Sequence, residues 1–269
     1  MVSKNIFASV AAAALLFPVA TFASPRTLPF SYPYETMPKG VAELELHVDM
    51  SPLRALATSG KSTWVTPSVI QTEFEYGITD RLELGLYVRV VPGVSARFAQ
   101  VGAISDGNAI KQRLRYRFAE AGQWPVDVSI YGEIVEGEAA VAFEAKVNLA
   151  RRFGRLLLLA NLWGEREYYY DGRADWVANP TGGFSYEVTP WFHPGVEYWM
   201  RKEVSNRPNA SAFMKQAQQF VGPTCMINFG RFWTSVGVYA RVNDVTHTAV
   251  PGESPGPMWV RTVIGVELP

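Results

Sequence analysis

The sequence predicts an all-β protein, a transmembrane antiparallel up-and-down β-barrel of about 12 strands that follows an N-terminal signal peptide. Three observations support this fold class. Apolar and polar residues alternate over most of the chain, an export signal precedes them, and short and long connections separate the alternating segments in turn. A strand directs successive side chains to opposite faces, so each strand has one apolar and one polar face. In an outer-membrane barrel the apolar face contacts lipid and the polar face lines the interior.

Residues 1–23 have the features of a secretory signal peptide. A basic residue near the start is followed by an apolar stretch, and Thr21-Phe22-Ala23 offers small residues at the two positions that a signal peptidase reads. The mature chain is then expected to comprise a periplasmic segment or plug over residues 24–40 and a barrel over residues 41–269. Later segments fall short of the roughly 20 uninterrupted apolar residues of a helical span, which argues against helical membrane architecture.

Alternating segments can be followed from the first strand to the end of the chain. The expected strands are residues 41–49, 67–77, 82–91, 108–119, 125–135, 139–151, 155–166, 177–188, 191–202, 216–229, 232–243 and 258–268. Their number is even, as in bacterial single-chain barrels. Pro194 and Pro223 fall inside strands, where each removes a hydrogen-bond donor, so a bulge or a shortened strand is expected at each.

The connections alternate in length. The tight ones are residues 77–81, 152–154, 189–190 and 230–231. The long ones are residues 50–66, 92–107, 167–176, 203–215 and 244–257. Outer-membrane barrels have short periplasmic turns and longer external loops, so both termini are expected on the periplasmic side. One external connection, at residues 136–137, is short.

Charged residues follow the polar phase of the strands, as a bilayer requires. A Lys or Arg that faces lipid at the midplane costs about 2–4 kcal/mol. The predicted pore-lining residues are Glu43, Glu45, Asp49, Glu73, Glu75, Glu83, Arg89, Lys111, Arg113, Arg115, Arg117, Asp127, Glu133, Glu144, Lys146, Glu197, Arg201, Arg241 and Arg261. The first three strands contribute a mostly acidic wall, and the fourth carries four basic residues at alternate positions.

Pairing the strands in sequence order predicts a ladder of interior ion pairs. The expected partners are Arg115 and Arg117 with Glu83 and Asp127, and Lys111 and Arg113 with Glu133. The ladder has two interpretations: it fills and rigidifies the barrel, or it lines a narrow pore whose opposed walls create a transverse field. Large interior side chains narrow the bore in either case, and they are Tyr87, Tyr131, Trp163, Trp199 and Tyr239.

The segment Glu73-Phe74-Glu75-Tyr76-Gly77-Ile78-Thr79-Asp80-Arg81-Leu82-Glu83-Leu84 resembles a hairpin that recurs in one family of proteobacterial outer-membrane proteins. That family is named for the meta-pathway of phenol degradation, and its members are described as transporter-like barrels. Residues 34–36 and 40–45 resemble the start of the family's first strand, so the resemblance is firm over about residues 34–90. It implies a small outer-membrane barrel that passes small organic molecules. The matching residues are structural, and the resemblance carries over no functional residue.

Other classes of function have little support in the sequence. The 25 basic and 25 acidic residues balance, which argues against nucleic-acid binding. The single Cys225 cannot form an intramolecular disulfide, and we expect no metal and no cofactor. The three histidines, His47, His193 and His247, share no local motif with a nucleophilic Ser, so we expect no enzymatic activity.

The sequence therefore predicts a bacterial outer-membrane barrel that forms a narrow pore or uptake path. Its expected partners are outer-membrane lipid and small organic solutes, and its oligomeric state is left open. One alternative is a non-conducting scaffold or receptor whose external loops bind a partner. Another is a surface lipid hydrolase.

Overall fold

The computed structural model describes residues 25–56, 62–92, 107–205, 217–243 and 257–269. The predicted signal peptide, residues 1–23, lies outside these ranges. So does His247, together with parts of the long connections.

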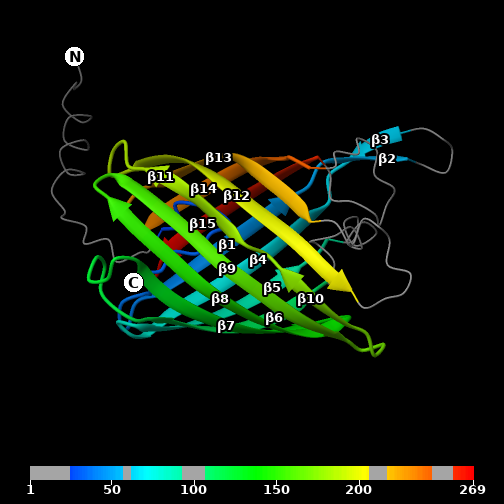
Figure 1. Ribbon diagram of the computed structural model, residues 1–269, viewed down its shortest axis with the longest axis horizontal. Helices are drawn as coiled ribbons and strands as arrows, with labels where there is room; N and C mark the ends of the chain where they lie inside the picture. Colours follow the sequence, from blue (N-terminus) through cyan, green and yellow to red (C-terminus); the bar gives the residue numbers. More distant parts are fainter. Residues whose placement is uncertain (1–24, 57–61, 93–106, 206–216, 244–256) are drawn as a thin grey trace, which may run out of the picture.

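The described strands form one closed antiparallel barrel of twelve strands (Figure 1). Its strands are β1 (Ala42–Met50), β4 (Ser68–Thr79), β5 (Leu82–Val90), β6 (Ala109–Arg117), β7 (Asp127–Gly137), β8 (Ala140–Phe153), β9 (Leu156–Tyr169), β10 (Ala174–Ala178) with β11 (Thr181–Tyr186), β12 (Phe192–Ser205), β13 (Gln218–Asn228), β14 (Phe232–Arg241) and β15 (Met258–Glu267). Strands that follow one another pair, and β15 pairs with β1 to close the ring. The predicted fold class is confirmed.

Proline shapes the wall at two places. β10 and β11 flank Pro180, and both pair with β9 and β12, so they are two parts of one interrupted strand. The β13–β14 pairing omits Gly222 and Pro223, but the register is the same on both sides of this gap. A missing N–H therefore leaves a break in the ladder without a register shift. The β4–β5 hairpin carries a register shift, between Gly77 and Thr79.

The two ends of the barrel differ. β2 (Leu53–Leu56) and β3 (Ser62–Val65) form a separate hairpin beyond one end of the barrel, which is called the long-loop end here (Figure 1). The C-terminus lies at the opposite, short-turn end. Within the described ranges, no helix has the length and apolar character to cross a bilayer.

The outer surface of the barrel is apolar and the interior is charged. Large apolar side chains stay exposed on the outward phase of the strands, among them Leu86, Ile110, Leu114, Ile130, Phe143, Leu162, Phe184 and Val238. Carboxylates and guanidinium groups are buried on the opposite phase. Exposure of this apolar belt to water would be unfavourable, whereas the hydrocarbon of a lipid bilayer matches it.

Replacing Leu84 with Arg tests which face contacts lipid. Leu84 lies on the outward phase of β5, opposite Leu114 of β6. We expect the Leu84→Arg barrel to lose about 2–4 kcal/mol of unfolding free energy, because a cation would face hydrocarbon. Urea titration of protein folded into lipid vesicles measures this loss. Leu84→Phe is the control and should stay close to wild type; equal stability of the Arg and Phe variants would contradict a lipid-facing position.

Candidate functional site

The structure places the predicted lining residues inside the barrel. Fifteen of them are buried, namely Glu43, Glu45, Asp49, Glu73, Glu75, Glu83, Arg113, Arg115, Asp127, Glu133, Glu144, Lys146, Glu197, Arg201 and Arg241. The other four are half-buried, namely Arg89, Lys111, Arg117 and Arg261. Their role as the lining of a pore stays a prediction.

Arg113 on β6 is the centre of the largest ion-pair cluster. Its Nε lies 2.8 Å from Oε1 of Glu73 and donates to the Tyr87 hydroxyl at 2.8 Å. Its two amino groups contact Glu75 and Glu83. The planar guanidinium has five donors in a fixed fork, against three on a lysine ammonium, and this suits it to bind several carboxylates at once.

Gly85 makes room for this guanidinium. A Cβ atom at Gly85 would lie only 2.4 Å from Nε of Arg113, closer than real Cβ atoms approach. Gly85 faces Arg113 directly across the β5–β6 pair. The absence of a side chain at this position therefore allows Arg113 to lie along the wall and reach the acidic strands β4 and β5.

Two predicted ion pairs are present in the structure. Arg115 Nη2 lies 2.7 Å from Oε2 of Glu83, and Lys111 Nζ lies 3.0 Å from Oε1 of Glu133. Arg113 stands opposite Glu133 in the β6–β7 register, yet its guanidinium extends toward β4 and β5 instead. The three carboxylates on that side offer it more acceptors than Glu133.

The expected pairing of Arg117 with the interior carboxylates is wrong. Arg117 Nη1 lies 2.5 Å from Oε2 of Glu120, and its Nη2 donates to the backbone oxygen of Asp80 at 2.7 Å. Asp127 accepts a hydrogen bond from the Gly122 backbone N–H at 2.7 Å. Both side chains lie at the short-turn end, where turn residues offer nearer partners than the opposite wall does.

Arg26 joins the acidic cluster from outside the barrel strands. Its Nη2 lies 2.7 Å from Oε2 of Glu45, 2.7 Å from Oε2 of Glu73 and 3.2 Å from Oε1 of Glu75. His47 also contacts Glu45, at 2.8 Å. Two guanidinium groups, those of Arg26 and Arg113, thus balance carboxylates that would otherwise be buried without partners, a strongly unfavourable state.

The N-terminal segment, residues 25–40, forms a loop inside the barrel. The backbone N–H groups of Phe30 and Ser31 donate to the Glu197 carboxylate at 3.1 and 2.6 Å. The Met37 N–H donates to Glu83 at 2.7 Å. The segment therefore bonds to opposite parts of the wall through its own backbone.

An aromatic cluster fills the barrel around Phe30. Phe30 stacks on Trp199 with ring centroids 4.4 Å apart, and Trp199 stacks on Phe220 at 4.3 Å. Trp259 meets Trp199 edge-on at 5.1 Å. The Arg261 guanidinium lies 3.8 Å from the Phe30 ring. These contacts pack the barrel interior around Phe30 with side chains.

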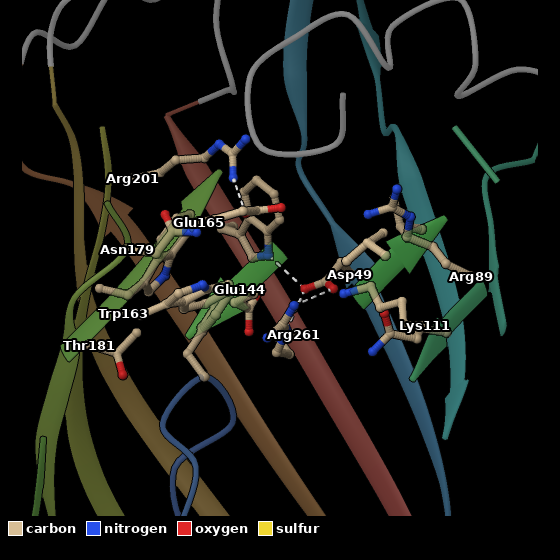
Figure 2. Close-up of a pocket in the computed structure, with 16 residues that line it drawn as sticks. Asp49, Arg89, Lys111, Glu144, Trp163, Glu165, Asn179, Thr181, Arg201 and Arg261 are labelled. Atoms are coloured by element: carbon tan, nitrogen blue, oxygen red, sulfur yellow. Dashed lines mark hydrogen bonds and ion pairs between the residues drawn. The ribbon is translucent and has the colours of Figure 1, made fainter. Parts of the chain in front are cut away.

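A cavity of about 120 Å³, lined in part by Phe30, lies inside the barrel and is called the long-loop cavity here (Figure 2). Its charged lining residues are the bases Arg89, Lys111, Arg201 and Arg261 and the acids Asp49, Glu144 and Glu165. Figure 2 shows Arg89 and Lys111 on one side and Glu144, Glu165 and Asn179 on the other, with the N-terminal loop below them. Arg201 lies beside Glu165, and Asp49 pairs with Arg261, so acidic and basic groups are interspersed around the cavity.

Two cavities of about 350 and 360 Å³ lie on the short-turn side of the N-terminal segment, residues 25–40. Both are lined by Glu35, and one also by Pro25, Thr27 and Pro33. Burial raises the pKa of the Glu35 carboxyl. The N-terminal segment therefore lies between open space at both ends of the barrel.

The alternating pattern did not identify Arg26 as an interior residue, because Arg26 precedes the first strand. A signal for it was present: Arg26 is the only basic residue between the expected cleavage site and Lys39, in a stretch rich in proline and aromatic residues. The prediction also left out an acidic group near the long-loop end, formed by Glu167, Asp175 and Glu203, whose oxygens lie within 4.8 Å of one another. Arg201 contacts this group through Glu167, at 3.1 Å.

The structure is similar to solved outer-membrane channels. An outer membrane channel from Pseudomonas putida F1 aligns with a TM-score of 0.57 and 13% identity over 87% of this chain and 98% of that chain. The NanC porin aligns with a TM-score of 0.54 and 10% identity over 84% and 99%. The KdgM porin aligns with a TM-score of 0.50 and 8% identity over 84% and 98%.

The sequence matches no protein-family model and no curated protein. At such low identities the structural likeness shows the fold. The closed barrel, its apolar outer surface and these neighbours place the chain among the β-barrels of the bacterial outer membrane.

Replacing Arg113 with Ala tests the central ion cluster. The change leaves Glu73, Glu75 and Glu83 without their main counter-charge in the barrel interior. We expect a loss of about 3–5 kcal/mol of unfolding free energy, as for removal of one partner of a buried pair. Urea titration in lipid vesicles measures it. Arg173→Ala is the control, because that side chain forms an exposed pair with Asp171 in a turn, and its unfolding midpoint should not move.

Proposed function

We propose that this chain is an outer-membrane channel for small polar molecules, and that its N-terminal segment narrows the lumen. The arrangement of open space carries the proposal: cavities lie at both ends of a closed barrel, and residues 25–40 lie between them. The likeness to a channel and to two porins supports it.

The N-terminal segment suits the role of a constriction because its contacts with the wall are non-covalent. Arg26 pairs with three carboxylates, and the backbone bonds to Glu197 of β12 and Glu83 of β5 attach the loop to two further places on the wall. Rearrangement of the segment would connect the cavities without opening the barrel wall. The wall itself is closed because each strand pairs with both of its neighbours, and opening it would break many hydrogen bonds at once.

Opposed charges would select among solutes in such a path. The acidic side chains of β1 and β4 and the basic side chains of β6 line the same lumen on neighbouring strands, and opposite charges along a narrow path order water and orient polar molecules. We infer small organic solutes as the cargo, and one solved structure of the KdgM porin is a complex with disordered oligogalacturonate. Contact with outer-membrane lipid follows from the apolar belt.

We also propose the finer family assignment, to the barrels named for the meta-pathway of phenol degradation. It rests on the hairpin over residues 73–84, which in the structure forms the tightly turned β4–β5 pair. We propose no enzymatic activity. His47 is enclosed among carboxylates, and His193 contacts the Pro190 backbone oxygen at 3.3 Å. An esterase assay that gave turnover would contradict this part of the proposal.

Replacing Arg26 with Ala tests the constriction. The variant loses the only side chain that pairs the segment with Glu45, Glu73 and Glu75, so the loop should leave its position more often. We expect larger or more frequent openings in single-channel recordings across a planar bilayer. Lys39→Ala is the control, since Lys39 is exposed at the short-turn end. Identical currents in all three proteins would contradict a constricting role, and a silent wild-type barrel would favour the receptor alternative.

Replacing Lys111 with Gln tests the electrostatic lining. Lys111 borders the long-loop cavity and neutralises Glu133, so its removal leaves an unpaired negative charge beside the path. We expect the reversal potential in a salt gradient to shift toward cation selectivity. The control is Arg155→Gln, a turn residue at the short-turn end, away from the long-loop cavity. An unchanged reversal potential in Lys111→Gln would exclude this residue from the conduction path.

A further inference from the structure

Two basic residues lie on the lipid-facing side of the wall, toward the long-loop end. Arg166 of β9 is half-buried and Lys202 of β12 is exposed, and both stand on the outward phase of their strands. A cation on this phase is costly at the bilayer midplane and nearly neutral at the level of the head groups. Their height in the wall therefore decides what they contact.

The length of β9 places Arg166 at the edge of the hydrocarbon. Leu156 begins β9 at the short-turn end, and Arg166 follows ten residues later. A strand rises about 3.3 Å per residue and tilts by about 40°, so the two residues differ in height by about 25 Å, which is also the height of the apolar belt of such a barrel. The short turns of these barrels are periplasmic, so Arg166 stands at the level of the head groups of the outer leaflet.

The strand register brings Arg166 and Lys202 to one patch of the outer surface. The short strand β10 lies between β9 and β12, with Trp176 opposite Arg166. Ala178 stands opposite Gly164 on one side and opposite Lys202 on the other. Arg166 and Lys202 are thus two strands and two residues apart, with about 12 Å between their Cα atoms. The long side chains can converge on one small anionic group over the space between them.

Aromatic rings hold the Arg166 guanidinium in place. Its central carbon lies 4.9 Å from the centroid of the Trp176 ring and 5.3 Å from that of the Tyr168 ring. Both rings are exposed on the outer surface. A cation–π contact of this kind occupies none of the five N–H donors of the guanidinium. The planar fork stays available to the oxygens of a phosphate, which it fits in bidentate fashion.

Neither base of this patch has a carboxylate partner among the described residues. Glu165 and Glu167, which flank Arg166 in the sequence, face the interior and contact Arg201 at 3.9 and 3.1 Å. Glu136 of β7 is an outward carboxylate, but it pairs with neither base. The positive charge of the patch is therefore left for a ligand outside the wall.

We propose that the patch formed by Arg166, Lys202, Trp176 and Tyr168 binds the phosphate of a glycolipid head group in the outer leaflet. The guanidinium donates hydrogen bonds to the phosphate oxygens, and the Lys202 ammonium supplies a second positive charge. The acyl chains lie against the apolar belt, where Leu162 is the next exposed large side chain of β9. The inference rests on the proposed contact with outer-membrane lipid, and it names the head group and the residues that bind it.

Native mass spectrometry of the folded mature chain in detergent tests the site, because it counts the lipids bound to each barrel. The probe is lipid A with two phosphate groups, and the comparison is the same lipid without phosphates. We expect the phosphorylated lipid to bind much more tightly. Arg166→Gln and Lys202→Gln should each weaken its binding about fivefold, the contribution of one base near a lipid surface, and the double variant should weaken it more than about tenfold.

Arg151→Gln is the matched control. Arg151 of β8 also faces outward, but it lies near the short-turn end and donates to the Trp124 backbone oxygen at 3.0 Å. The change removes the same charge as Arg166→Gln, and we expect it to leave lipid binding unchanged. Urea titration verifies that the variants fold. Arg166 and Lys202 lie on the outer surface without ion pairs in the described part of the chain, so their unfolding midpoints should stay at the wild-type value.

Three results would overturn the proposal. The first is equal affinity for the lipids with and without phosphate, which would show attraction by the acyl chains alone. The second is unchanged affinity in the double variant. The third is equal weakening by Arg151→Gln, which would show attraction by net charge rather than by a site.

Conductance separates this proposal from that of a channel. Steady single-channel currents in a barrel without preference for the phosphorylated lipid would keep the channel and overturn the head-group site. Phosphate-dependent binding that requires Arg166 and Lys202, in a folded but silent barrel, would keep the site and overturn the channel.

Discussion

The pairing of buried charge inside the barrel is the interaction on which the rest of the structure depends. A wall surrounded by lipid has to direct its ionised side chains inward, and once there they need partners because water is scarce. Arg113 provides most of this pairing for β4 and β5. Arg26 provides it for β1 and β4, and in doing so it holds the N-terminal segment in the lumen. The ion cluster and the position of the N-terminal segment in the lumen thus have one cause.

Small residues in the wall make the close contacts possible. Gly85 lets the Arg113 guanidinium lie along β5. On the other side of the barrel, Cβ atoms at Gly183 and Gly195 would lie 3.1 and 3.2 Å from the methyl groups of Leu28. The N-terminal loop therefore packs against a stretch of β11 and β12 without side chains. Asn179, which precedes Pro180 at the break between β10 and β11, lines the long-loop cavity. The interrupted strand β10–β11 therefore contacts the N-terminal loop and also forms part of the cavity wall.

The alternation of polar and apolar residues was sufficient to predict the twelve strands of the wall and the inward phase of their charges. It did not predict the β2–β3 hairpin, and the expected long connection at residues 167–176 is wrong, because β9 and β10 extend into it. Arg115 with Glu83 and Lys111 with Glu133 followed from sequence order, because adjacent antiparallel strands fix which residues stand opposite. The carboxylates that pair with Arg113 could not be predicted from the strand order. Its long side chain reaches past its register neighbour to three carboxylates on the other side, and strand pairing specifies the position of a Cα atom rather than of a guanidinium.

The sequence by itself determined the barrel, its strand order and the face on which each charge lies, because these depend on a period of two and on local turns. Only the tertiary structure decided the place of the N-terminal segment, since Arg26 finds its carboxylates 19 to 49 residues away along the chain. It also decided which interior groups were left to form the cavity wall. Such contacts depend on how twelve strands curve around a common axis, and no local pattern in the chain contains that information.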